Sequence, residues 1–251
     1  MGGVERTVPR NKSEFVAQHL LDRIITANLM PGSTFGTEAD LLAQFDVSRP
    51  TLRESLRILE AQGVLELRPG PKGGVIVSKP GVDVLAHSLS VYLRLHGVPF
   101  IKVLKAREAI EPPLAGAAAL ARSEADLAAL QDSVDRLAAA ESEGDFIEEN
   151  RRFHSLVAHA GANEVMKLFW QTISMLATGE QQGINYTPAN RRHVVAAHQS
   201  IVDAIRAGDP REAEHRMRAH IEELEQLIRK RYQYFLNQAT TIVARSGRRL
   251  D

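Results

Sequence analysis

Hydrophobic positions at the start of the chain repeat with the spacing of α-helices. Val16, Leu20 and Ile24 recur every four residues after Ser13, a residue type that favours a helix N-cap. This pattern predicts a first helix that runs to about residue 27, where Met-Pro-Gly breaks it. A second, shorter helix is expected after Thr37, and its apolar positions are Leu41, Leu42 and Phe45.

The third predicted helix, over residues 48–62, has two opposite faces. Leu52, Leu56 and Leu59 form an apolar stripe that we expect to be buried. The opposite face carries arginines four residues apart, at Arg49, Arg53 and Arg57. A helix buried on one side and cationic on the other is suited to the major groove of DNA.

Two short β-type runs follow, over residues 64–67 and 75–77, and a turn rich in Gly and Pro joins them. Three helices followed by a hairpin are typical of a winged helix-turn-helix, with the hairpin as the wing. We therefore predict a loose N-terminal arm over 1–11, a DNA-binding domain over 12–78 and a linker over 79–82.

From residue 83 the chain becomes rich in Ala and Leu and has almost no strand signal. We predict a mainly α protein, with an all-α bundle of six or seven helices over 83–236 and a tail over 237–251. Pro112 and Pro113 interrupt a helical pattern, so a helix should bend or begin there. The expected helix boundaries are Ser123 with Asp126, Gly144, Gly161, Gly183, Thr187 with Pro188, and Asp209 with Pro210.

Composition narrows the class of protein. The 251 residues are 44% hydrophobic and include no cysteine, which excludes disulfides and thiolate metal sites. We expect a cytoplasmic protein, because we find neither a secretory signal nor an apolar run long enough to span a membrane. Net charge is zero, and residues 1–80 hold ten Lys or Arg against nine Asp or Glu. DNA binding must therefore depend on a local patch of arginines.

Some of the candidate DNA-contacting residues have an alternative role. Arg49 lies in the first turn of the third helix, where it can reach a base edge, and Arg53 can reach a base or a phosphate. Arg57 can touch DNA or pair with Glu54 or Glu60. Lys72 is either a phosphate contact or an exposed turn lysine. Ser48 and Thr51, at the start of the third helix, are also candidate DNA contacts.

Several polar side chains of the helical region could hold a metal. Asn150 and His154 are four residues apart and share a helix face, while His198 and His220 lie in later helices. Three imidazoles and one oxygen suit zinc first, with nickel, manganese or iron as alternatives. The histidines could instead be core packing, or hold a purely structural metal. His159, His193 and His215 are five residues from these positions and should face elsewhere.

Two regions resemble a known family. Residues 31–43 and 47–63, including Val-Ser-Arg-Pro-Thr-Leu-Arg-Glu, resemble the GntR family of bacterial transcription regulators. The helical region resembles the FCD effector domain of the FadR-like branch. It does so through Ala-Arg-Glu-Ala-Ile-Glu at 106–111, Asn-Arg-Arg-Phe-His at 150–154, His-Gln-Ser-Ile at 198–201 and His-Ile at 220–221.

The resemblance implies roles and shows departures. Arg49 and Arg53 match arginines that contact operator DNA, and Gly70 matches the glycine at the wing tip. Ala39 and Pro69 stand where some relatives have a DNA-contacting arginine and a wing histidine, so the operator sequence cannot be transferred. Asn150 replaces the usual aspartate ligand.

The expected function is a metabolite-responsive transcription regulator. It would bind a palindromic double-stranded operator as a homodimer and act as a repressor. An effector, by resemblance a small organic acid, would bind near the metal. Arg107 could anchor its carboxylate or could pair with Glu111 within its own helix. The alternative is a metal-dependent hydrolase or oxygenase, which the absence of a convincing general base disfavours.

Overall fold

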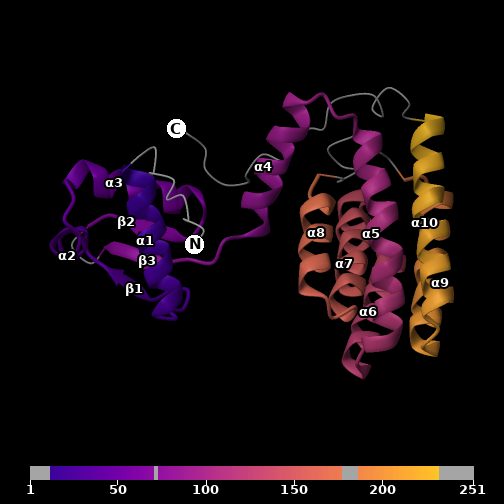
Figure 1. Ribbon diagram of the computed structural model, residues 1–251. Coiled ribbons are helices and arrows are strands. Elements are labelled where there is room, and N and C mark those ends of the chain that lie inside the picture. The colour runs from indigo at the N-terminus through magenta and orange to yellow at the C-terminus, as the bar shows by residue number, and fades with distance from the viewer. Residues whose placement is uncertain (1–11, 71–72, 177–185, 232–251) are drawn as a thin grey trace, which may run out of the picture. The chain divides into compact units, whose positions relative to one another are not determined.

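The computed structural model describes residues 12–70, 73–176 and 186–231 (Figure 1). The chain divides into two compact units between Val84 and Leu85. Over the described residues the protein is mainly helical, as the sequence predicts, with a small sheet confined to the first unit.

The first unit combines three helices and a three-stranded sheet. Its helices are α1 (Lys12–Thr26), α2 (Glu38–Gln44) and α3 (Arg49–Ala61), and its strands are β1 (Thr34–Gly36), β2 (Leu65–Arg68) and β3 (Gly74–Val77). Strands β2 and β3 form the predicted hairpin, from the pair Leu65–Val77 to the pair Arg68–Gly74. Strand β1 was not predicted, and it pairs with the other edge of β3 in the order β1-β3-β2.

Apolar stripes of α1, α2 and α3 form the core of this unit. Leu20, Leu41 and Leu52 are fully buried, and the sheet adds residues such as Leu65 and Val75. A buried hydrogen bond fixes the position of α3 against α1. The Ser55 hydroxyl donates it to the carbonyl oxygen of Ser13 at 2.8 Å. Helix α3 is thus anchored on its buried face, and its opposite face is exposed.

Seven helices make up the remainder of the described chain, in agreement with the predicted six or seven. They are α4 (Val82–Leu95), α5 (Phe100–Ala121), α6 (Glu124–Ala139), α7 (Glu143–Ala160), α8 (Glu164–Ser174), α9 (Pro188–Ala207) and α10 (Pro210–Arg231). The boundary predicted at Gly183 lies outside the described residues. None of the described helices combines the length and hydropathy that a bilayer span requires.

Helix α5 organises the bundle. It continues through Pro112 and Pro113 as one helix, although neither proline can donate a backbone hydrogen bond. It lies along α10 and also contacts α7, α8 and α9 (Figure 1). At Gly116 the approach of α10 is so close that a Cβ would come within 2.6 Å of Oε1 of Glu214. Any larger residue at position 116 would have to displace that side chain.

Most predicted caps occur where the sequence places them, but Ser13 lies inside α1, which already includes Lys12. Thr37 with Asp40 and Ser123 with Asp126 form capping boxes at the starts of α2 and α6. Thr187 caps α9 ahead of Pro188. Arg122 covers the other end of α9, because its Nε and Nη2 donate to the carbonyl oxygens of Ile205 and Arg206.

Candidate functional site

The recognition helix α3 presents its arginines to solvent. Ser48 is the N-cap, and its hydroxyl accepts a hydrogen bond from the backbone N–H of Thr51 at 3.3 Å. The hydroxyls of these two residues lie 2.7 Å apart, so both take part in starting the helix. The side chains of Arg49 and Arg53 are 64% and 59% exposed, while Leu52, Leu56 and Leu59 are buried behind them.

A carboxylate on the preceding helix contacts both arginines, which the sequence analysis did not foresee. Nε of Arg53 donates to the Glu38 carboxylate with both oxygens at 3.0 Å, and Nε of Arg49 lies 3.8 Å from Oε1. Glu38 stands in the first turn of α2. It partly neutralises the cationic stripe and holds Arg53 in a defined position.

A groove separates the recognition helix from the wing. Arg53 and Arg57 line one side, and Arg68 of β2 lines the other. Within the described chain Arg57 pairs with neither Glu54 nor Glu60, and Glu60 instead accepts the backbone N–H of Leu67. Arg68 pairs with Glu66 at 3.0 Å, and that contact raises the pKa of Arg68. Arg68 is an additional cation that the sequence analysis missed.

The wing tip is open. Gly70 has a φ of 103°, which disfavours other residues, and a Cβ there would meet no atom within 4 Å. A glycine in this position leaves the backbone accessible to a close partner. Lys72, the other wing candidate, lies outside the described residues.

Three histidines converge in the interior of the helical unit. His154 of α7, His198 of α9 and His220 of α10 are all at least 95% buried. Nε2 of His220 lies 3.2 Å from Nε2 of His198 and 3.3 Å from Nε2 of His154. Ligand nitrogens about 2.0 Å from a tetrahedral metal are separated by roughly 3.3 Å. The donor set therefore fits a metal, and these are the three histidines that the sequence analysis selected.

Ring packing and a carboxylate contact orient two of the imidazoles. The ring of His198 stacks on the buried ring of Phe153, with centroids 3.8 Å apart. Nδ1 of His154 lies 2.6 Å from Oε2 of Glu111, which leaves its Nε2 facing the other histidines. A carboxylate behind a histidine is a common way to fix a metal ligand.

Arg107 contacts the far side of that carboxylate. Its Nε donates to Oε1 of Glu111 at 2.5 Å, and both side chains are buried. Burial alone would raise the pKa of Glu111, but Arg107 and His154 outweigh it and hold the pKa well below its usual range. Of the two roles considered for Arg107, the structure shows the intrahelical pair, and Arg107 is not among the residues that line the cavity described below.

The environment of His198 and His220 favours the neutral form of each imidazole, which can bind a metal. Burial, together with the neighbouring histidines, lowers the pKa of His198 well below its ordinary value. Burial is the largest cause that lowers the pKa of His220, to about 3. Neutral imidazoles keep the lone pairs that a metal ion needs.

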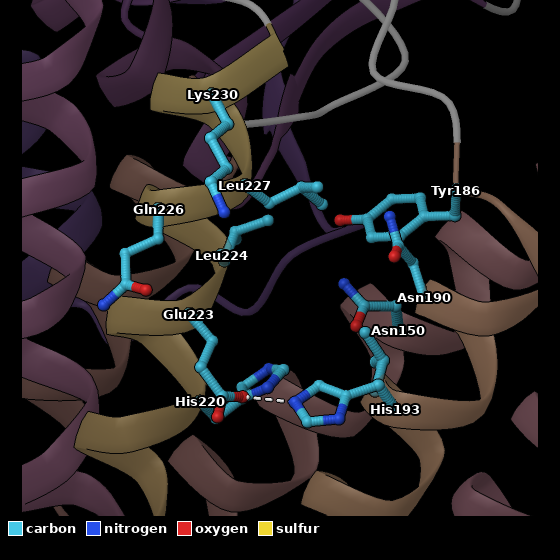
Figure 2. Close-up of a pocket in the computed structure, with 11 residues that line it drawn as sticks. Asn150, Tyr186, Asn190, His193, His220, Glu223, Leu224, Gln226, Leu227 and Lys230 are labelled. Atoms are coloured by element: carbon cyan, nitrogen blue, oxygen red, sulfur yellow. Dashed lines mark hydrogen bonds and ion pairs between the residues drawn. The ribbon is translucent and has the colours of Figure 1, made fainter.

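A cavity of about 280 Å³ opens beside His220, between α7, α9 and α10 (Figure 2). Asn150, one turn before His154, lines it, and its amide points into it. His193, expected to face elsewhere, also lines the cavity and contacts Glu223 of α10 at 2.7 Å. That contact joins residues 30 positions apart, so no local spacing could have predicted it.

Comparisons with known proteins identify the domain families of both regions. Residues 12–76 match the bacterial regulatory proteins of the gntR family, and residues 102–223 match the FCD domain. The chain belongs to the GntR family. It is a transcription regulator with an FCD domain, and it is not an enzyme. FCD domains of these regulators commonly bind a metal, and this chain has the three-histidine group for it.

Individual relatives extend over most of the chain. The HTH-type transcriptional regulator LutR of Bacillus subtilis is 27% identical over 82% of this chain and 95% of its own length. The HTH-type transcriptional repressor NanR of Cronobacter sakazakii is 27% identical over 86% and 85%. A solved GntR structure from Streptococcus agalactiae, 26% identical, covers 85% of this chain and 99% of that one with a TM-score of 0.65.

Proposed function

We propose that this regulator is a zinc-dependent repressor that binds a palindromic operator as a homodimer and responds to a small organic acid. The observation that carries the proposal is the convergence of three Nε2 atoms next to a cavity. His220 belongs both to the histidine cluster and to the cavity wall. A ligand in the cavity can therefore reach the metal position directly.

Zinc suits the donor set better than harder cations do. His154, His198 and His220 would hold the ion, and the separations of Nε2 of His220 from the other two Nε2 atoms match tetrahedral coordination. The fourth position is left for the Asn150 amide or for an effector carboxylate. Bound there, the metal would supply a positive charge that attracts a carboxylate.

The first unit supports the DNA-binding part of the proposal. Arg49 and Arg53 would contact bases from α3, with Ser48 and Thr51 close to the backbone and Gly70 at the wing. One winged helix reads a short half-site, so a symmetric dimer on a palindrome supplies the needed length. Because the target is bacterial DNA, we place the protein in the cytoplasm.

The names of two relatives support the proposals that this protein is a repressor and that its effector is a carboxylate. NanR is named a repressor, and a relative from Escherichia coli K12, 28% identical over 85% of this chain and 85% of its own length, is named a putative L-lactate dehydrogenase operon regulatory protein. We therefore propose both that the protein represses transcription and that its effector is a carboxylate metabolite.

The test is fluorescence anisotropy on DNA from upstream of the protein's own gene and its neighbours. Zinc-loaded wild type should bind one fragment, with an affinity that falls steeply with salt. Replacing Arg49 and Arg53 together by alanine should abolish binding, whereas Arg206→Ala, a matched surface change on α9, should not. A double variant that binds as wild type overturns the DNA-binding assignment.

The acid response is tested on the same complex. Small carboxylates, including L-lactate, should release the operator from zinc-loaded protein and should act more weakly after chelation. Circular dichroism establishes whether the chelated protein is still folded. If an acid acts equally on a folded, metal-free protein, the metal holds helices together and does not bind the effector.

A further inference from the structure

One wall of the cavity is a single stripe of helix α10. His220, Glu223, Leu224, Gln226, Leu227 and Lys230 all line the cavity, and each lies three or four residues from another member of the set. This spacing keeps side chains on one face of a helix. The stripe therefore orders the chemistry along the cavity, from a histidine of the metal cluster at one end to a lysine at the other.

The two charged side chains on that wall differ in whether another side chain already pairs with them. Glu223 is engaged by His193 at 2.7 Å. Lys230, in contrast, makes no ion pair within the described part of the chain, and Figure 2 shows its amine directed back along α10 toward Leu227 and Leu224. Arg107 is held by Glu111 and does not line the cavity. The cation available to a ligand is thus Lys230.

The middle of the cavity has a mixed character. Leu224 and Leu227 on α10 and Val194 on α9 offer an apolar surface. Asn150, Asn190 and Tyr186 lie on the opposite side, and Figure 2 shows the Tyr186 hydroxyl pointing toward Leu227. A carbon chain can lie against the leucines, while the amides can accept or donate hydrogen bonds along it.

We infer that the effector of this regulator is a dicarboxylate, with one carboxylate at the metal position beside His220 and the other on Lys230. The inference rests on the proposed function, because it assumes that an acid binds in this cavity. Ten residues of helix separate the two anchors, a rise of about 15 Å between their Cα atoms. The lysine side chain reaches back along part of that distance, which suits a chain of roughly five to seven carbons.

The experiment is isothermal titration of the full-length, zinc-loaded protein with two ligand series. One runs from succinate to pimelate, and the other contains monocarboxylates with the same number of carbons. At matched length the dicarboxylate should bind roughly five- to tenfold more tightly, a modest gain because Lys230 is exposed. Glutarate, adipate and pimelate should show the largest difference.

Two variants locate the second anchor. Lys230→Gln should remove the preference for dicarboxylates and leave monocarboxylate affinity unchanged. Arg229→Gln removes the same charge from the adjacent residue, which pairs with Glu225 at 2.7 Å and does not line the cavity, so the preference should remain. Melting temperatures of both variants establish that each is folded.

The outcomes distinguish failure of the Lys230 assignment from failure of the proposed acid response. Equal affinity for both series, or a preference that survives Lys230→Gln, overturns the Lys230 assignment while acid sensing stands. If neither series binds to the zinc-loaded protein, both the assignment and the proposed acid response are overturned.

Discussion

Oε2 of Glu111 lies 2.6 Å from Nδ1 of His154, and this contact turns the opposite nitrogen of the ring toward His220. Glu111 is itself held by Arg107 one turn earlier on α5. The site thus has a buried carboxylate behind one histidine, although Asn150 brings no charge to the metal position. The negative charge of Glu111 lies behind His154, and Arg107 of the same helix balances it.

Replacing Glu111 by glutamine should weaken zinc binding about 10- to 100-fold, because the carboxylate orients His154 and increases its basicity. Competition with a chromophoric chelator measures the change. Glu108→Gln is the control, since Glu108 pairs with Lys105 on the same helix and does not contact a histidine. Equal zinc affinity in wild type and the Glu111 variant, with both folded, would show that the contact has no such role.

Replacing Asn150 by aspartate should strengthen zinc binding by roughly tenfold, because an anionic oxygen replaces a neutral one beside the metal. The same chelator competition measures it. Asn190→Asp adds an equal charge to another residue of the cavity wall and serves as the control. If the two variants gain equally, the effect is general electrostatics and Asn150 is not a ligand.

Removing the charge of Glu38 should reduce the sequence selectivity of DNA binding. In Glu38→Gln the carboxylate that positions Arg53 at 3.0 Å is lost, while the net positive charge of the surface rises. Binding to unrelated DNA should therefore tighten, and the ratio of operator to unrelated affinity should fall several-fold. Anisotropy titrations on both DNAs at fixed salt measure that ratio. A ratio that stays constant would assign Glu38 no part in recognition.

Acid should weaken the start of helix α6. The hydroxyl and backbone N–H of Ser123 donate to Asp126, and these hydrogen bonds lower the pKa of that carboxyl. A lowered pKa means that the ionised form stabilises the fold above the unfolded pKa near 4, and that this contribution is lost as pH falls below it.

Melting temperatures between pH 6 and pH 3 test this expectation. The difference between wild type and Asp126→Asn should be largest at pH 6 and should shrink toward pH 3. Ser123→Ala should cost about 1 kcal/mol of unfolding free energy at neutral pH. A difference that stays constant over the range would rule out ionisation of Asp126 as the cause.

Local chemistry made much of this fold predictable. Leu52, Leu56 and Leu59 fixed the buried face of α3 by their spacing alone, and Thr37, Ser48 and Ser123 marked helix starts because their hydroxyls accept backbone N–H groups. The three histidines were identifiable because their positions match the metal ligands of the FCD domain that the helical region resembles; His159, His193 and His215 lie on the same helices.

Features that depend on tertiary packing were not predictable. Strand β1 has three residues and exists as a strand only because β3 offers a free edge. The contacts of Glu38 with Arg53 and of His193 with Glu223 join separate helices. Which way Arg107 faces depends on the rotation of α5 against its neighbours, and spacing gave equal support to both of its roles.

The contact between Glu38 and the arginines has a consequence for how the regulator finds its target. A DNA-binding region with nearly balanced charge and partly neutralised arginines releases few counterions on random sequence. The protein should therefore spend little of its time trapped along the chromosome and more of it diffusing freely. Operator occupancy would then follow the number of regulator molecules per cell closely, because bulk DNA holds few of them in reserve.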